Sequence, residues 1–194
     1  MFTDRTVTVL TAATGHANLS RCIESVQRQT YAQTEHLILI DGPERDQPVR
    51  RAVSAINAIK TIHLLTLPEI TGLDGWNGHR IYAAGSFLCN TEFICFLNEN
   101  RWFEPDHVQS LLSAIDAEKA PWAFASVNEA DPPADANCFM VRRVAAVLSA
   151  PAWYVPGPSI PDAAIRDLLL EHLPKPATNG RQTVHSSAAN DGMQ

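Results

Sequence analysis

The sequence lacks the features that mark several large classes of protein. Its 194 residues carry 15 Lys and Arg against 21 Asp and Glu, a net charge of −6, so it has no basic excess to bind nucleic acid or an anionic membrane. It has no apolar run long enough to span a bilayer. The first residues, MFTDRTVTVL, lack a basic segment followed by an apolar one, so we expect no secretory signal.

Cysteine and glycine are sparse as well. The four cysteines, Cys22, Cys89, Cys95 and Cys138, form neither a CxxC pair nor a zinc-finger spacing, and each lies among apolar neighbours. We expect buried free thiols in a protein of the reducing cytoplasm. The stretch TAATGHAN, after the first apolar run, holds a single glycine. A Gly-rich phosphate-binding loop is therefore absent there, which disfavours a different doubly wound protein such as a nucleotide-binding regulator.

What the chain does contain suits one well-buried domain. Hydrophobic residues make up 45% of the sequence, enough for a sizeable core. The apolar pattern ends near Lys175. The predicted domain therefore spans residues 1–175, and residues 176–194 are predicted to be a polar tail with disorder expected at its end.

Short β-rich runs alternate with longer stretches whose apolar residues recur every three or four positions. Strands are predicted at residues 7–11, 36–40, 63–65, 93–97, 123–127 and 138–141. Helical stripes are predicted within residues 19–26, 52–59, 81–88, 108–115 and 165–169. This alternation predicts an α/β fold, a mainly parallel sheet flanked by helices in a single domain.

Polar residues collect where the predicted strands end. Thr11 closes the first strand, Asp41 the second, and Asn98-Glu99-Asn100 the fourth. Because the carboxyl ends of parallel strands share one edge of a sheet, we expect these groups to meet at one rim, where ligands bind. Asp, Asn and Thr also favour helix starts, so each residue alone is consistent with a purely structural role.

Two long stretches carry a distinctive set of motifs. The first is TVTVLTAATGHANLSRCIESVQRQTYAQTEHLILIDG, with a predicted strand, the element S-V-x-x-Q-T-Y at Ser25 to Tyr31, and a second strand ending in an acidic residue. The second is WNGHRIYAAGSFLCNTEFICFLNENRWFEPDHV, with a predicted helix, an apolar strand, a polar segment and then aromatic-x-x-Pro. Both stretches resemble family 2 glycosyltransferases, enzymes of the GT-A fold, in which the polar segment is D-x-D. The resemblance covers residues 5 to about 116 well and extends weakly to about residue 170.

The resemblance implies a set of nucleotide-sugar-binding residues. Thr11, Ala12 and Ala13 would line the nucleotide pocket, and Asp41 would accept a hydrogen bond from the base or ribose. Asn77 and Arg80 occupy the family's Asn/Arg-containing segment, where an arginine lies near the nucleotide. Asp41-Gly42 could equally form an ordinary strand-to-loop turn, and we favour the binding role.

The metal segment departs from the family pattern. Aspartates of D-x-D hold Mg²⁺ or Mn²⁺ against the diphosphate, and this chain has Asn98, Glu99 and Asn100 there. Replacing two aspartates with neutral amides removes two negative charges, so binding of Mg²⁺ or Mn²⁺ through Glu99 and Asn100 is expected to be weakened. Arg80, or less readily Arg101, could offset the diphosphate charge instead. We favour a solvated helix-start position for Arg101.

The later part of the sequence supplies a candidate general base. Asp162 stands where a family-like base would be expected, and it is also a favourable first-turn helix residue. Trp153 and Tyr154 could stack on an acceptor sugar or pack over the core. His185 lies where some relatives carry a late metal ligand, although its polar surroundings favour a solvent-exposed residue.

Two interpretations follow from the resemblance. The first is an inverting glycosyltransferase that moves a sugar from a nucleotide-diphosphate sugar, uridine-linked, to an unknown small-molecule or glycan acceptor. The second is a catalytically impaired nucleotide-sugar-binding protein that has lost the metal site, which Asn98 and Asn100 favour. Neither interpretation involves nucleic acid or an integral membrane segment.

Overall fold

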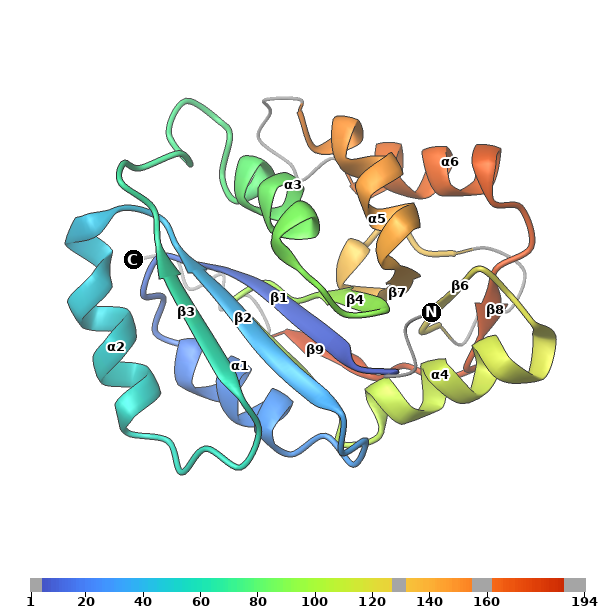
Figure 1. Ribbon diagram of the computed structural model, residues 1–194, viewed down its shortest axis with the longest axis horizontal. Coiled ribbons are helices and arrows are strands. Elements are labelled where there is room, and N and C mark those ends of the chain that lie inside the picture. Colours follow the sequence, from blue (N-terminus) through green and yellow to red (C-terminus); the bar gives the residue numbers. More distant parts are fainter. Residues whose placement is uncertain (1–4, 127–131, 155–161, 187–194) are drawn as a thin grey trace, which may run out of the picture.

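A seven-stranded sheet in the order β3-β2-β1-β4-β7-β6-β8 forms the centre of the protein (Figure 1). The computed structural model describes residues 5–126, 132–154 and 162–186. Strands β3, β2, β1 and β4 are mutually parallel, while β7 runs antiparallel to both β4 and β6. The mainly parallel sheet flanked by helices predicted from the sequence is therefore confirmed.

The strands and helices have the following bounds. The strands are β1 (Val7–Ala13), β2 (Thr34–Ile40), β3 (Ile62–Thr66), β4 (Phe93–Phe96), β5 (Arg101–Phe103), β6 (Trp122–Phe124), β7 (Phe139–Arg142), β8 (Ala177–Thr178) and β9 (Val184–Ser186). The helices are α1 (Leu19–Gln27), α2 (Asp46–Ser54), α3 (His79–Leu88), α4 (His107–Glu118), α5 (Arg143–Ser149) and α6 (Asp162–His172).

The two faces of the sheet carry different helices because side chains alternate along a strand. Ala13, Ile38 and Ile40 form one buried cluster with α1 and α2. On the opposite face α3 packs closely on β1, so that a Cβ added at Gly85 would lie 2.5 Å from a methyl carbon of Leu10. Figure 1 shows α3, α5 and α6 on one side of the sheet and α1, α2 and α4 on the other.

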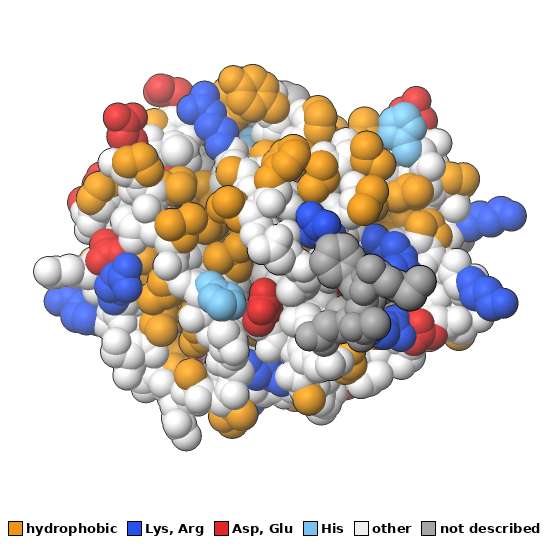
Figure 2. Space-filling view, in the orientation of Figure 1, with side chains coloured by type: hydrophobic (Ala, Val, Ile, Leu, Met, Phe, Trp, Pro, Cys, Tyr) orange, Lys and Arg blue, Asp and Glu red, His pale blue; other side chains and the backbone are white. Residues whose placement is uncertain are grey.

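Helices α3 and α5 also present apolar side chains to solvent. Phe87 and Leu88 of α3 are 61% and 50% exposed, and Val144 and Leu148 of α5 are 67% and 58% exposed. Hydrophobic side chains gather on the upper half of the face in Figure 2, where these helices lie in Figure 1. Exposed apolar groups of this kind are typical of contact surfaces.

A second, two-stranded sheet pairs β5 antiparallel with β9. Residues 101–103 are therefore a strand, and Arg101 is not the helix-start residue expected from the sequence. The hydrogen-bonded partner of β5 lies far along the chain, at Val184–Ser186, so local sequence patterns gave no sign of the pairing.

Ordered structure continues beyond the expected domain boundary at residue 175. Strand β8 pairs in parallel with β6, and the side chains of Ala177 and Val184 are buried. Residues 176–186 thus pack onto the domain rather than forming a separate tail, because their apolar side chains complete the core beside α4. Residues 187–194 of the expected tail lie outside the described residues.

The described residues give two further findings. All four cysteines are free and buried, and burial raises the pKa of the Cys22 thiol to about 12, which keeps it protonated and unreactive.

No helix in the described ranges combines the length and the apolar character needed to cross a membrane.

Candidate functional site

A cavity of about 280 Å³ lies at the carboxyl ends of the parallel strands. Its wall includes Ala12 near the end of β1, Thr14 after β1, Asp41 after β2, Asn77 before α3, and Asn98 and Glu99 after β4. Groups that are far apart in the sequence therefore meet at one rim, where parallel α/β sheets bind ligands.

The carboxylate of Asp41 holds the loop between β3 and α3. It is 1% exposed, and its Oδ1 accepts hydrogen bonds from the backbone N–H (2.6 Å) and the hydroxyl (2.9 Å) of Thr71. Its Oδ2 accepts from the N–H of Gly72 (3.2 Å) and from Nη1 of Arg45 (2.7 Å). A Cβ at Gly72 would lie 2.8 Å from that oxygen, so the contact depends on glycine. Asp41 lines the cavity with both oxygens already engaged.

Glu99 is engaged in the same way with the loop that follows β1. Its Oε2 accepts hydrogen bonds from the backbone N–H groups of Thr14, Gly15 and His16, each at 3.0 Å. Its Oε1 accepts from the N–H of Thr14 at 2.9 Å and also from the Thr14 hydroxyl. The side chain is largely buried, and these donors offset its negative charge.

Asn98 begins a chain of hydrogen bonds that reaches Arg101. The backbone N–H of Asn98 donates to Oδ1 of Asn137 (2.6 Å), and Nδ2 of Asn137 donates to Oδ1 of Asp135 (2.7 Å). Nη1 of Arg101 lies 2.5 Å from Oδ2 of Asp135. Asp135 and Asn137 thus fix the turn after β4, a role that their position in a Pro/Asp-rich connection did not reveal.

The segment 98–100 does not fit a divalent cation site. Both oxygens of Glu99 accept hydrogen bonds, and Oδ1 of Asn98 accepts from the N–H of Asn100 at 3.1 Å. Neutral amides are weaker ligands than carboxylates for a hard cation. Across the described ranges, no group of three or more His, Cys, Asp or Glu side chains could hold a metal ion. His185 instead contacts Oε1 of Glu104 at 2.7 Å.

Asp162 opens helix α6 in partly buried surroundings. Burial, together with the nearby charge of Asp135, raises the pKa of Asp162 to about 6. Its Oδ1 is buried without a hydrogen-bond partner among the described residues. A carboxylate that is poorly solvated and titrates near neutral pH is suited to accept a proton.

Arg45 and Tyr82 are among the cavity residues that the sequence interpretation missed. Arg45 ends the short 3-10 helix Pro43–Arg45 and lines the cavity beside Asp41. Tyr82 of α3 also lines it, with its hydroxyl donating to the carbonyl of Leu97 at 3.3 Å. The spacing Asp41 to Arg45 is the one signal that could have pointed to an ion pair at this rim.

Several residues expected at the site lie elsewhere. Thr11 and Ala13 point to the α1 side of the sheet, because residues of a strand alternate between faces, and the Thr11 hydroxyl bonds Nε2 of His36 at 2.9 Å. Arg80 does not line the cavity and stacks on Trp76, 3.8 Å from the ring centroid. Asn100 is exposed outside it.

The two aromatic residues proposed for acceptor stacking have different environments. Trp153 is 1% exposed and packs against Tyr82 and Phe96, with ring centroids 4.9 and 5.2 Å away. Trp153 is therefore a core residue. Tyr154 is 68% exposed and lies 5.0 Å from the ring of Trp76.

Comparison with models of protein families finds a matching family. The family described as Glycosyl transferase family 2 matches residues 8–134, more than half of the sequence. The chain belongs to glycosyltransferase family 2. The matched residues of this family 2 chain include the rim residues from Thr14 to Glu99, whereas Asp162 lies beyond them. A search of curated protein sequences finds no match.

Solved structures share the fold of this family 2 chain. S. aureus TarS 1-349 has a TM-score of 0.69 at 9% identity, over 93% of this chain and 60% of that one. The same protein in complex with UDP-GlcNAc has a TM-score of 0.69 at 11% identity, over 97% and 60% of the two chains. S. aureus TarS has a TM-score of 0.68 at 9% identity, over 95% and 37%. This chain thus spans 60% or less of those proteins, and the likeness establishes the fold.

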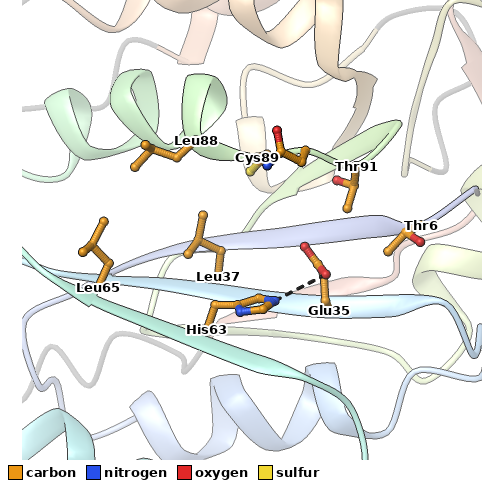
Figure 3. Close-up of a pocket in the computed structure, with 9 residues that line it drawn as sticks. Thr6, Glu35, Leu37, His63, Leu65, Leu88, Cys89 and Thr91 are labelled. Atoms are coloured by element: carbon orange, nitrogen blue, oxygen red, sulfur yellow. Dashed lines mark ion pairs between the residues drawn. The ribbon is translucent and has the colours of Figure 1, made fainter. Parts of the chain in front are cut away.

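A larger cavity, about 510 Å³, lies away from the rim (Figure 3). Leu37, Leu65 and Leu88 supply its apolar wall, and Nε2 of His63 lies 3.5 Å from Oε2 of Glu35. Thr6 and Thr91, which also line it, precede β1 and β4, so the cavity lies at the opposite end of the strands from Asp41. Size alone does not identify the functional site, and the position at the carboxyl strand ends favours the smaller cavity.

Proposed function

We propose that this family 2 chain transfers a sugar from a nucleoside diphosphate sugar, uridine-linked, to an acceptor hydroxyl with inversion at the anomeric carbon. The observation that carries the proposal is the meeting of Ala12, Asp41, Asn98 and Glu99 around one cavity at the carboxyl ends of β1, β2 and β4. The uridine-linked donor is supported by the complex of S. aureus TarS with UDP-GlcNAc.

The cavity would hold the nucleotide part of the donor. Its volume of about 280 Å³ is near the lower end of the range for small-molecule sites, so it suits part of a sugar nucleotide rather than all of it. Asn77 and Asn98 line it with amide groups that can donate to and accept from ribose or base. Asp41 and Glu99 act by fixing the loops that form its walls.

Asp162 would serve as the general base of the transfer. As the acceptor oxygen attacks the anomeric carbon, its proton passes to the Asp162 carboxylate. The bond between the anomeric carbon and the phosphate oxygen breaks, its electron pair leaves with the nucleoside diphosphate, and the new bond forms on the opposite face of the sugar. The raised pKa of Asp162, about 6, makes it a stronger base than an ordinary aspartate while leaving it ionised at neutral pH.

Calorimetry with UDP tests the proposal directly. We expect binding by the whole chain, with uridine alone binding more weakly because it lacks the diphosphate. The titration is performed once with Mn²⁺ and once with EDTA. Absence of binding in both conditions would refute the proposed donor site.

A second candidate function is nucleotide-sugar binding without transfer. The engagement of Glu99 by the loop after β1 and the amides at positions 98 and 100 favour it, since little is left to hold a metal ion against a leaving diphosphate. An assay for hydrolysis of UDP-GlcNAc separates the two candidates. Turnover that disappears in Asp162→Asn supports transfer, and binding without any turnover supports the second candidate.

The proposed partners are the nucleotide sugar and a small-molecule or glycan acceptor. Tyr154, exposed beside Trp76, is a candidate contact for an acceptor sugar ring. A cytoplasmic location is part of the proposal, and the four free, buried cysteines support it because they suit a reducing compartment.

A further inference from the structure

Arg45 is the sole cationic residue lining the proposed donor cavity among the described residues. It ends the 3-10 helix that follows β2, and its side chain is 26% exposed. The other charged residues of the wall are Asp41 and Glu99. A ligand that carries negative charge into this cavity therefore meets one complementary charge, on Arg45.

The arginines expected to offset a diphosphate have other partners. Arg80 stacks on the ring of Trp76 with its guanidinium carbon 3.8 Å from the centroid. Arg101 pairs with Asp135 at 2.5 Å, in the network that fixes the turn after β4. Neither side chain lines the cavity. Their engagement leaves Arg45 as the group best placed to contact an anion there.

The contact between Arg45 and Asp41 orients the guanidinium and leaves most of its donors available. Nη1 of Arg45 is bound to Oδ2 of Asp41 at 2.7 Å. A guanidinium carries five N–H donors in a rigid plane, and this contact uses one of them. Asp41 would keep its hydrogen bonds from Thr71 and Gly72 whether or not Arg45 also binds a ligand.

We propose that Arg45 binds the diphosphate of the donor and that this binding needs no divalent cation. The inference rests on the proposed function and adds how the leaving group is held. Guanidinium binds phosphate oxygens in a bidentate manner, so it can replace part of the charge that a metal ion supplies. The negative charge of Glu99 opposes the ligand little, because three backbone N–H groups of residues 14–16 already surround it.

The experiment measures the affinities of uridine, UMP and UDP by calorimetry in EDTA. The proteins are the wild type, Arg45→Gln, Arg45→Lys and the control Arg50→Gln. Arg50 is an exposed arginine of α2 that pairs with Asp46 outside the cavity. Losing a charge-assisted hydrogen bond is expected to weaken UDP binding by about 10- to 100-fold in Arg45→Gln. Arg45→Lys should lie between it and the wild type, and Arg50→Gln should match the wild type.

The affinity for uridine, which carries no phosphate, distinguishes the loss of a contact with the diphosphate from damage to the structure of the cavity. We expect equal uridine affinity in the wild type and Arg45→Gln, which also shows that the variant is folded. A parallel loss of uridine and UDP affinity, or UDP binding that Arg45→Gln leaves unchanged, would overturn the role of Arg45. Wild-type binding of UDP only when Mn²⁺ is added would overturn the metal independence. Failure of the wild type to bind UDP in either condition would instead refute the proposed function.

Discussion

The carboxylate of Glu99, in the turn after β4, is hydrogen-bonded to Thr14, the residue that follows β1. Its carboxylate accepts from both the backbone N–H and the hydroxyl of Thr14, and the two residues are 85 positions apart in the sequence. A carboxylate that the family resemblance assigns to a metal ion thus closes the rim of the cavity. The hydrogen bonds to Glu99 thus fix the loop after β1 to the turn that follows β4.

Glu99→Gln is expected to destabilise the protein. The amide keeps the shape of the side chain but loses the negative charge, and its NH₂ group would face backbone N–H donors. We expect the free energy of unfolding to fall by about 1 to 3 kcal/mol, measured by urea denaturation. The matched control is Glu24→Gln, an exposed glutamate paired with Arg28 on α1, for which a change within about 0.5 kcal/mol is expected. Unchanged stability in Glu99→Gln would contradict the structural role of this carboxylate.

The double substitution Asn98→Asp/Asn100→Asp is expected to tighten Mn²⁺ binding. It restores two carboxylates to the segment after β4, and hard cations prefer charged oxygen ligands. We expect an increase in affinity of about tenfold or more, measured by titration with MnCl₂, corresponding to about 1.4 kcal/mol. Equal affinity in the variant and the wild type would show that carboxylates at positions 98 and 100 do not create a cation site.

Activity should depend on pH through Asp162. A general base must be deprotonated, so kcat/KM for hydrolysis of UDP-GlcNAc is expected to rise as the pH increases through the pKa of about 6. Asp162→Asn should lower turnover by about 100-fold or more and remove this rise. Asp167→Asn, on the exposed side of the same helix, is the control and should retain both. A pH profile that is unchanged in Asp162→Asn would identify another group as the base.

The raised pKa of Asp162 also affects folding. Activity is expected to rise with pH, whereas the contribution of Asp162 to stability is expected to fall. The folded state favours protonated Asp162, so its contribution to stability is fully present below the ordinary pKa of 3.8 and is lost as the pH rises through about 6. Asp162→Asn is therefore expected to be at least as stable as the wild type at pH 7, measured by urea denaturation. A loss of activity with retained stability would distinguish a catalytic role from a structural one.

Two buried histidines predict a loss of stability in acid. Burial lowers the pKa of both His36 and His107 from 6.5 to about 3. As the pH falls, the two histidines become protonated in the unfolded chain before they do so in the folded protein. The stability that the neutral histidines contribute is therefore present above pH 6.5 and is lost as the pH falls from there to about 3. Within that window, each histidine should add about 1.4 kcal/mol per pH unit to the slope of the free energy of unfolding against pH.

Urea denaturation at several pH values checks this slope. His107→Gln is expected to reduce the slope even though it loses the contact with the Thr183 hydroxyl and is less stable at pH 7. The exposed His172 offers a control, since His172→Gln should leave the slope unchanged. A slope in His107→Gln equal to that of the wild type would exclude this histidine as a source of the acid sensitivity.

The alternation of strands and helices could be predicted because it depends on neighbours in the sequence. Apolar runs such as Phe93–Phe96 became buried strands, and the stripe from Val108 to Ile115 became the core face of α4. Residues 101–103 and 184–186 could not be predicted in this way, because short strands are defined by a partner remote in the sequence. The helix α5 was also missed, since its seven residues are too few to show a clear period.

The sequence by itself determined the α/β fold, the family resemblance and the arrival of several polar strand ends at one rim, because each follows from local pattern and the rules of parallel sheets. Only the tertiary structure decided which of those polar groups have oxygens or nitrogens left for a ligand. Asp41 and Glu99 are engaged by loops 30 and 85 residues away, while Arg45 faces the cavity. The physical reason is that a hydrogen bond requires two atoms to lie within about 3 Å of each other, and the packing of distant segments sets those distances.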